Sequence, residues 1–239
     1  MKINVNALSR ELSLKIIGFE EIDSTSLYFT HLIKNGEALP DAVFANKQTN
    51  GQGRVGKSFF SPADTGLYIT FRFSEHDLIC NYLTPRVALA VAVAIENVFH
   101  IDCGVKWVND IYYQNKKVAG VLCQRVLEHI LIGVGINVEM PNDIPSELTG
   151  RFGTLCETCD KEKYSQLIKE LYDSFNMVFA LPLESVLSQY RKRCIHINKK
   201  VRLENNNQII SGVCVGISDN FSIQIGDEKQ SFYSGYLTI

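Results

Sequence analysis

Residues 103–140, CGVKWVNDIYYQNKKVAGVLCQRVLEHILIGVGINVEM, decide the fold of this chain. Apolar residues in this stretch recur in short runs rich in β-branched and aromatic side chains, which is typical of strands rather than helices. Polar breaks separate the runs, and the break at Asn115-Lys116 is typical of a tight hairpin turn. We therefore expect an antiparallel meander that forms the central sheet.

The sequence before this meander alternates between strand and helix patterns. Short β-rich runs predict strands at residues 15–22, 41–48 and 66–74. Helical periodicity predicts one helix that ends at Gly36 and another over residues 83–99. Because strands and helices are interleaved here, at least part of the sheet should be flanked by helices.

After the meander the pattern changes twice. Residues 160–179 and 182–193 have the period of helices, and from about Ile195 the chain consists of short β segments separated by Asn- and Gly-containing turns. The predicted fold class is α+β, with a mixed central sheet flanked by helices in a domain at residues 1–194. A small C-terminal β-barrel is predicted at residues 195–239.

Composition excludes several classes of protein. The chain of 239 residues has 24 Lys and Arg against 26 Asp and Glu, so its net charge of -2 gives no field for non-specific nucleic-acid binding. The longest apolar run, residues 87–95, is shorter than the roughly 20 residues of a membrane-spanning helix. The N-terminus lacks the pattern of a signal peptide, and the odd number of cysteines, 7, indicates reduced thiols. These features predict a cytoplasmic protein without nucleic-acid or membrane partners.

The glycine-rich loop at residues 51–58, GQGRVGKS, matches more than one motif. It fits the phosphate-binding pattern G-x-x-x-x-G-K-[ST] and the dinucleotide pattern G-x-G-x-x-G, but both need a helix to follow immediately. Pro62 and another strand pattern follow instead. The third interpretation is a glycine-rich lid whose cations, Arg54 and Lys57, fold over an anionic ligand.

Six motifs and the single residue Gln48, in a common order, support the interpretation as a lid. The chain resembles the biotin protein ligases in Asp23-Ser24-Thr25-Ser26, Gln48, the loop from Gly51 to Lys57, Phe60-Ser61-Pro62, Lys106-Trp107-Val108-Asn109-Asp110, Lys117-Val118-Ala119-Gly120 and Ile132-Gly133-Val134-Gly135-Ile136-Asn137. The resemblance covers residues 16–140 and continues more weakly to the C-terminus. Each motif is weak by itself, and their common order and spacing make the resemblance specific.

The sequence also departs from the family pattern at several positions. The family usually has Asn at Ser26, Arg at Gln52 and Lys57, Trp at Phe59, Pro at Val108 and Glu at Gln124. The missing cation at Gln52 removes a charge that would help to neutralise a phosphate or carboxylate. Phe59 keeps an aromatic face for packing on adenine but lacks an indole donor.

The resemblance implies an ATP-dependent ligase with a class II synthetase-like catalytic domain. Such an enzyme activates the carboxylate of biotin as biotinyl-5′-AMP, with Mg²⁺, and transfers biotin to a lysine of a biotin carboxyl carrier protein. Only 22 residues precede Asp23, so we expect a stand-alone form without an N-terminal DNA-binding domain. The sequence leaves open whether the protein is a monomer or a homodimer.

The same resemblance implies roles for individual residues. Lys117 and Arg54 are the candidate catalytic cations, because negative charge accumulates where a carboxylate attacks the α-phosphate. Asp110 is a possible metal ligand. The candidate biotin-binding residues are Ser24, Thr25, Ser26, Gln48, Gly51, Gln52, Gly53, Arg54, Lys117, Gly120 and Gly133. The candidate nucleotide-binding residues are Arg54, Lys57, Phe59, Lys106, Asn109, Gly135 and Asn137.

Two other functions remain as alternatives. A lipoate or octanoate ligase or transferase on a related fold is one, although the cationic lid and the Lys106–Asp110 segment favour biotin. A repressor that holds biotinyl-adenylate as a corepressor is the other. The single pair Cys156 and Cys159 has no second pair and no neighbouring histidine, so we interpret it as two packed thiols and not as a zinc or redox site.

Overall fold

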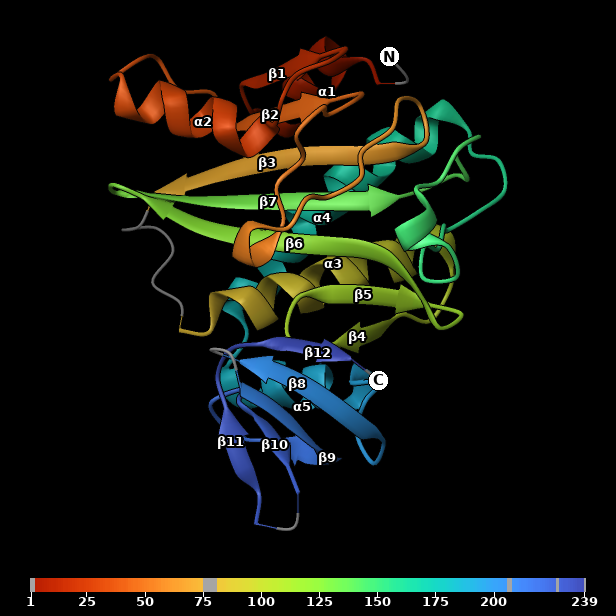
Figure 1. Cartoon of the computed structure of the whole chain (residues 1–239). Coiled ribbons are helices and arrows are strands. Elements are labelled where there is room, and N and C mark those ends of the chain that lie inside the picture. Colours follow the sequence, from red (N-terminus) through yellow and green to blue (C-terminus); the bar gives the residue numbers. More distant parts are fainter. Residues whose placement is uncertain (1–2, 75–80, 206–207, 227, 239) are drawn as a thin grey trace.

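The computed structural model describes residues 3–74, 81–205, 208–226 and 228–238. It contains a seven-stranded sheet and a five-stranded sheet, and Figure 1 shows the smaller sheet below one edge of the larger one. Cys80, one of the seven cysteines predicted to be reduced thiols, lies outside the described residues.

The large sheet has the strand order β1-β2-β3-β7-β6-β5-β4. β1 pairs with β2 in parallel, and the remaining pairs are antiparallel, which confirms the predicted mixed sheet. Its strands are β1 (Ile16–Phe19), β2 (Ala42–Ala45), β3 (Gly66–Ser74), β4 (Gly104–Lys106), β5 (Asp110–Tyr113), β6 (Lys116–Val126) and β7 (His129–Asn137).

The hairpin between β5 and β6 turns one residue earlier than predicted. Tyr113 pairs with Lys116, so the two turn residues are Gln114 and Asn115. Both have left-handed backbones, with φ of 49° and 60°. This is the geometry of a type I′ turn, whose twist matches that of the flanking strands.

The predicted helices are present, and one more helix was not predicted. α2 (Thr25–Lys34), α3 (Leu83–Phe99), α4 (Lys161–Ala180) and α5 (Leu183–Arg193) begin and end within a few residues of the expected positions. The additional α1 (Val5–Leu12) begins at Asn4, whose side chain accepts a hydrogen bond from the amide of Ala7. Two short 3₁₀ turns complete the set, η1 (Arg54–Gly56) and η2 (Ser146–Leu148). None of the helices in the described ranges is both long and apolar enough to cross a membrane.

The two faces of the large sheet carry different layers. Along β7, Ile130, Ile132, Val134 and Ile136 enter the main core with α3 and α4. Leu131, which points to the other face, packs in a second cluster with residues of α2. Alternation therefore places Gly133 and Gly135 on the α2 face, where the absence of side chains leaves room beside the helix.

The small sheet is open, so the predicted closed barrel is wrong. Its order is β11-β10-β9-β8-β12, and within the described residues its end strands β11 and β12 do not pair with each other. Its strands are β8 (Lys200–Asn205), β9 (Gln208–Ile217), β10 (Ile223–Ile225), β11 (Gln230–Phe232) and β12 (Tyr236–Thr238). The end strands are short, and the buried face of the sheet packs on the larger domain instead of closing on itself.

Specific hydrogen bonds fasten the small sheet to the larger domain. The indole of Trp107 donates to the carbonyl of Phe221 at 2.8 Å, and Arg191 donates to the carbonyl of Ile217 at 2.8 Å. Arg191 also pairs with Asp219 at 2.9 Å. Residues of β8, β9 and β10 belong to the same hydrophobic core as α3 and the large sheet. The two parts are therefore held in a fixed relation.

His196, in the link between α5 and β8, makes the protein sensitive to acid. Its ring is fully buried and neither ring nitrogen has a hydrogen-bond partner. Burial, with smaller contributions from Lys106 and Lys199, lowers the pKa of His196 to about 4 from 6.5. Between pH 6.5 and about pH 4 the imidazole of His196 is therefore protonated in the unfolded chain but neutral in the folded chain. The free energy of unfolding decreases as the pH falls through this window.

We expect this residue alone to remove about 3 kcal/mol of unfolding free energy near pH 4. The measurement is denaturant unfolding of the wild type and of His196→Leu at pH values between 7 and 4. The variant should lose less stability on acidification than the wild type, whatever its stability at pH 7. The matched control is His31→Gln on the exposed surface of α2. If the wild type and His196→Leu have parallel curves, the assignment is wrong.

Candidate active site

One cavity of about 900 Å³ lies on the α2 face of the large sheet, between that sheet, the glycine-rich loop and the small sheet. A volume of this size is sufficient for a ligand as large as a nucleotide conjugate. Ser24 and Gly51 do not line it. The predicted site residues that do are Thr25, Ser26, Gln48, Gln52, Gly53, Arg54, Lys57, Phe59, Lys106, Asn109, Asp110, Lys117, Gly120, Gly133, Gly135 and Asn137.

The glycine-rich loop folds back on itself over the cavity. Bridges join Gln48 to Ser61 and Gln52 to Ser58. The backbone at Lys57 is extended, with ψ of 150°, and no helix follows before β3. The phosphate-binding and dinucleotide interpretations of this loop are therefore wrong, because both need a helix at this point. The loop has the position expected of a lid.

Phe59 lies over a floor made of glycines. Gly120 on β6 pairs with Gly135 on β7. A Cβ atom at Gly135 would lie 2.4 Å from the ring of Phe59, and one at Gly120 would lie 3.3 Å from it. Only glycine permits the ring to approach the sheet this closely. A flat ligand that entered this space would meet the same bare backbone, with Phe59 as an aromatic neighbour.

A relay of neutral polar groups forms one end of the site. Gln48 accepts from the amide of Thr25 at 2.9 Å and donates to Ser61 at 2.9 Å. The hydroxyls of Thr25 and Thr70 share a hydrogen bond of 2.8 Å, and Ser26 lies 3.4 Å from Thr70. These hydroxyl and amide groups can both donate and accept, and they carry no charge. This end is suited to a neutral ligand group that has both donors and acceptors.

Ser24 and Gly51 do not line the cavity but stabilise the segments that carry its neutral polar residues. The hydroxyl of Ser24 accepts from the amide of Leu27 at 3.5 Å and caps α2. A Cβ atom at Gly51 would lie 2.4 Å from the carbonyl oxygen of Phe59 and 3.1 Å from Nε2 of Gln48. Gly51 therefore lets the loop approach Gln48 closely. Gln52 donates to the carbonyl of Asn50 at 2.7 Å within the loop.

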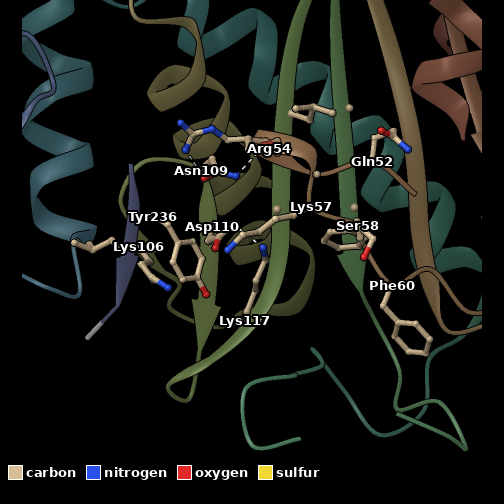
Figure 2. A pocket seen from close by; sticks show the side chains of 18 of the residues that line it. Gln52, Arg54, Lys57, Ser58, Phe60, Lys106, Asn109, Asp110, Lys117 and Tyr236 are labelled. Carbon is tan, nitrogen blue, oxygen red and sulfur yellow. Dashed lines mark hydrogen bonds and ion pairs between the residues drawn. The ribbon is translucent and has the colours of Figure 1, made fainter. Parts of the chain in front are cut away.

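Cations gather at the opposite end (Figure 2). Lys117 Nζ lies 2.7 Å from Asp110 Oδ1. Arg54 donates to Asn109 Oδ1 at 3.0 Å, and Asn109 in turn donates to the carbonyl of Val121 at 3.0 Å. Arg54 in the lid is thus connected through Asn109 to β6, the strand that carries Gly120. Its planar guanidinium has further N–H groups that can donate to a ligand.

Lys106 is the most buried of these cations, with 9% of its surface exposed. Burial lowers the pKa of Lys106, and the nearby charges of Lys117, Arg151 and Lys57 act in the same direction against the opposing effect of Asp110. Its ammonium lies 3.4 Å from the hydroxyl of Tyr112. Positive groups that repel one another at a partly desolvated site favour an anionic ligand between them.

Asn137 has a structural role in this cavity wall. Its Nδ2 donates to the carbonyl of Gly153 at 3.1 Å and to the carbonyl of Lys117 at 3.3 Å. Its buried Oδ1 has no hydrogen-bond partner in the protein.

Several lining or supporting residues were not found from the sequence. Thr70 is a buried polar residue in an otherwise apolar run, GLYITFRF, and that contrast was an available signal. The position of Arg151 after β7 and that of Tyr236 in the small sheet had no signal in local sequence, because both reach the cavity through tertiary packing. Phe60 packs edge-on against Phe152, with 6.0 Å between ring centres.

Metal and thiol chemistry find little support among the described residues. Within those residues, no group of three or more His, Cys, Asp or Glu side chains is placed to hold a metal ion. The carboxylate of Asp110 is engaged by Lys117. Cys156 and Cys159 form no disulfide, as expected, and burial raises the pKa of Cys159 to about 12. That thiol is protonated near neutral pH and is a poor nucleophile.

Residues 18–137 match the sequence model of the Biotin/lipoate A/B protein ligase family. The chain is 30% identical over 210 residues to the bifunctional ligase/repressor BirA of Escherichia coli, which covers 82% of this chain and 64% of that protein. It is 24% identical over 186 residues to the biotin–[acetyl-CoA-carboxylase] ligase of Mycobacterium tuberculosis, covering 74% and 70% of the two. The chain therefore spans less than two thirds of the length of the first of these relatives.

Solved structures with the same fold include biotin protein ligases. The biotin protein ligase from Aquifex aeolicus in complex with biotin and ATP superposes with a TM-score of 0.78 and 27% identity. The match covers 94% of this chain and 97% of the other. A biotin protein ligase from Leishmania major in complex with biotinyl-5-AMP, with 19% identity and a TM-score of 0.63, shares the fold.

Proposed function

The chain belongs to the biotin/lipoate A/B protein ligase family, and we propose that it activates biotin with ATP and transfers it to a lysine of a carrier protein. In the first step a carboxylate oxygen of biotin attacks the α-phosphorus of ATP, and pyrophosphate leaves. In the second step a lysine amine attacks the carbonyl of biotinyl-5′-AMP, an amide forms and AMP leaves.

The observation that carries this proposal is a floor of glycines with neutral polar groups at one end and a cation at the other. A Cβ atom at Gly133 would lie 3.3 Å from Oγ of Ser26, and one at Gly120 would lie 3.2 Å from Nζ of Lys117. Biotin has a neutral ureido ring with one carbonyl and two N–H groups at one end and a carboxylate at the other. Thr25, Ser26 and Gln48 supply donors and acceptors for the ring. The dithiolane of lipoate and the alkyl chain of octanoate have no N–H or carbonyl for these groups.

Adenylation requires cations that are held in place before charge develops. Attack of a carboxylate on a phosphate brings two anions together, so preorganised donors stabilise the transition state more than the separated reactants. We assign this work to Lys117 and Arg54. Lys117 is positioned by Asp110, and Arg54 is positioned by Asn109. Lys106 and Lys57 lie beside them and face the leaving phosphates in this arrangement.

The adenine in this proposal packs on Phe59, above Gly135, with Asn137 as its polar neighbour. The loop then excludes water from the reactive anhydride until the acceptor lysine arrives. The other predicted roles also remain part of the proposal: Ser24, Gly51, Gln52, Gly53, Gly120 and Gly133 at the biotin end, and Asn109 at the nucleotide end.

The remaining expectations belong to the same proposal. Mg²⁺ enters this proposal as the counter-ion that ATP carries, because it neutralises the charge of the phosphates. The acceptor is a biotin carboxyl carrier protein. We propose residues 1–194 as the catalytic domain and residues 195–239 as the small C-terminal domain. Free thiols and the need for ATP favour the cytoplasm as the location.

A substrate assay tests the proposed function. With ATP, biotin should release pyrophosphate and label a lysine of a carrier domain, while equal concentrations of lipoate and octanoate should neither be activated nor compete. The physical reason is that lipoate and octanoate would leave the polar groups of Thr25, Ser26 and Gln48 without hydrogen-bond partners, which costs binding energy. The ureido ring of biotin supplies those partners. Release of pyrophosphate with lipoate and not with biotin would overturn the assignment of the substrate.

A variant of Thr25 tests whether the neutral polar end of the cavity binds biotin. Thr25→Val keeps the shape of the side chain and removes the hydroxyl that bonds to Gln48 and Thr70. It should raise the KM for biotin and leave the KM for ATP nearly unchanged. Thr30→Val, which removes a hydroxyl on the same helix that bonds to the carbonyl of Ser26, serves as the control because Thr30 does not line the cavity.

A further inference from the structure

The lid touches the small C-terminal sheet through one close contact. Lys57 follows η1 in the lid, and its ammonium lies 3.1 Å from the centre of the Tyr236 ring. Tyr236 belongs to β12, the strand at one end of the small sheet, and lines the cavity. Lys106 of the large sheet lies 5.4 Å from the same ring centre. Figure 2 shows both ammonium groups beside Tyr236.

We infer that Tyr236 positions the lid by holding Lys57 against its ring, so that closure over the cavity depends on the small sheet. This inference deepens the proposed function and rests on it for its catalytic consequence. Tyr236 is a positioning residue and acts through Lys57. Arg54 ties the lid to the large sheet through Asn109, and Lys57 ties the same loop to the small sheet.

The electrostatics of the contact explain why an aromatic residue is needed. The face of an aromatic ring carries negative charge density and attracts a cation without adding a formal charge. A carboxylate at this position would pair with the lid lysine but would also repel the phosphates of ATP. A ring holds Lys57 beside Lys106, whose pKa is lowered mainly by burial, and leaves the cavity cationic.

The position of Tyr236 allows its substitution without loss of the fold. The residue is 36% exposed and lies in an end strand, where its backbone pairs with Glu204 on β8. Its ring is therefore available to contact the lid, and a different side chain leaves the backbone pairing of the strand intact. Tyr233, in the bend between β11 and β12, is 69% exposed and does not line the cavity, so it is a matched control.

The first test uses the ligand-free protein and trypsin, which cleaves after Lys and Arg. Cleavage after Lys57 should be about 2- to 5-fold faster in Tyr236→Leu than in the wild type, the factor that an exposed cation–π contact supplies. Tyr236→Phe keeps the ring and should restore the wild-type rate, which a merely structural role of the hydroxyl would not do. Tyr233→Leu should cleave at the wild-type rate.

The second test measures the consequence for the reaction. After incubation with biotin and ATP, Tyr236→Leu should release bound biotinyl-5′-AMP about 2- to 5-fold faster, and Tyr236→Phe should not. If Tyr236→Leu unfolds at the assay temperature, Lys57→Met tests the same contact from the lid, with cleavage read after Arg54. Wild-type cleavage rates in Tyr236→Leu, or equal acceleration in Tyr236→Phe, would overturn the inference. Failure of the wild type to activate biotin would instead reject the proposed function, and the trypsin comparison would still decide the role of Tyr236.

Discussion

Lys117→Ala is expected to lower the kcat for biotin-dependent adenylation by about 10²-fold or more, the usual loss when one preorganised donor to a developing charge is removed. The KM for biotin should rise by a smaller factor, because the ammonium interacts most strongly with charge that appears in the transition state. The measurement is exchange of labelled pyrophosphate into ATP at varied concentrations of biotin.

The structure defines two controls for this result. Lys117 pairs with Asp110 at 2.7 Å, so the variant leaves a carboxylate without its partner, and thermal unfolding must be recorded beside activity. Lys116→Ala changes the preceding residue, which is exposed and does not line the cavity, and should retain activity. If Lys117→Ala remains folded with near-normal kcat, Lys117 has no catalytic role.

Arg54→Gly is expected to release bound biotinyl-5′-AMP about 10- to 100-fold faster than the wild type. The substitution removes a guanidinium that ties the lid to Asn109 at 3.0 Å and, in our proposal, binds the adenylate. Hydrogen bonds to charged groups contribute about 1.5–3 kcal/mol each, which corresponds to that factor. Adenylation itself should become slower but remain measurable, because one of the two proposed catalytic cations, Lys117, remains in place.

Released adenylate can be detected by its chemistry, since a free mixed anhydride acylates lysines of any protein nearby. Arg54→Gly should therefore label albumin added as a bystander, whereas the wild type should label mainly the carrier domain. Arg54→Lys keeps the charge without the planar fork and should give an intermediate release rate. Equal bystander labelling by the wild type and Arg54→Gly would show that Arg54 does not retain the adenylate.

Local sequence patterns predicted most of the secondary structure because they depend on contacts between near neighbours. The short β-rich runs of residues 103–140 predicted the antiparallel strands β4 to β7, and the period of residues 83–99 predicted α3. All of these elements are present. The short helix α1 was missed, although Val5, Leu8 and Leu12 recur at helical spacing after the cap at Asn4. The motifs also predicted the site residues, and all of those except Ser24 and Gly51 line one cavity.

Tertiary structure decided what local patterns cannot encode. Thr70 became part of the polar relay because β3 lies beside α2, and Arg151 faces the cavity because the chain after β7 returns across β6. The end strands of the small sheet are too short to close a barrel, and its apolar face is covered by the larger domain.

The sequence by itself determined the strands, the principal helices, the glycine floor and the identity of the cations, because spacing along a strand or helix sets which face a side chain occupies. Only the tertiary structure decided which partners those side chains meet. Lys57 and Tyr236 are far apart in the chain, and no periodicity relates them, yet they lie in contact across the cavity. Such contacts follow from how whole layers pack, and packing depends on all the buried side chains together.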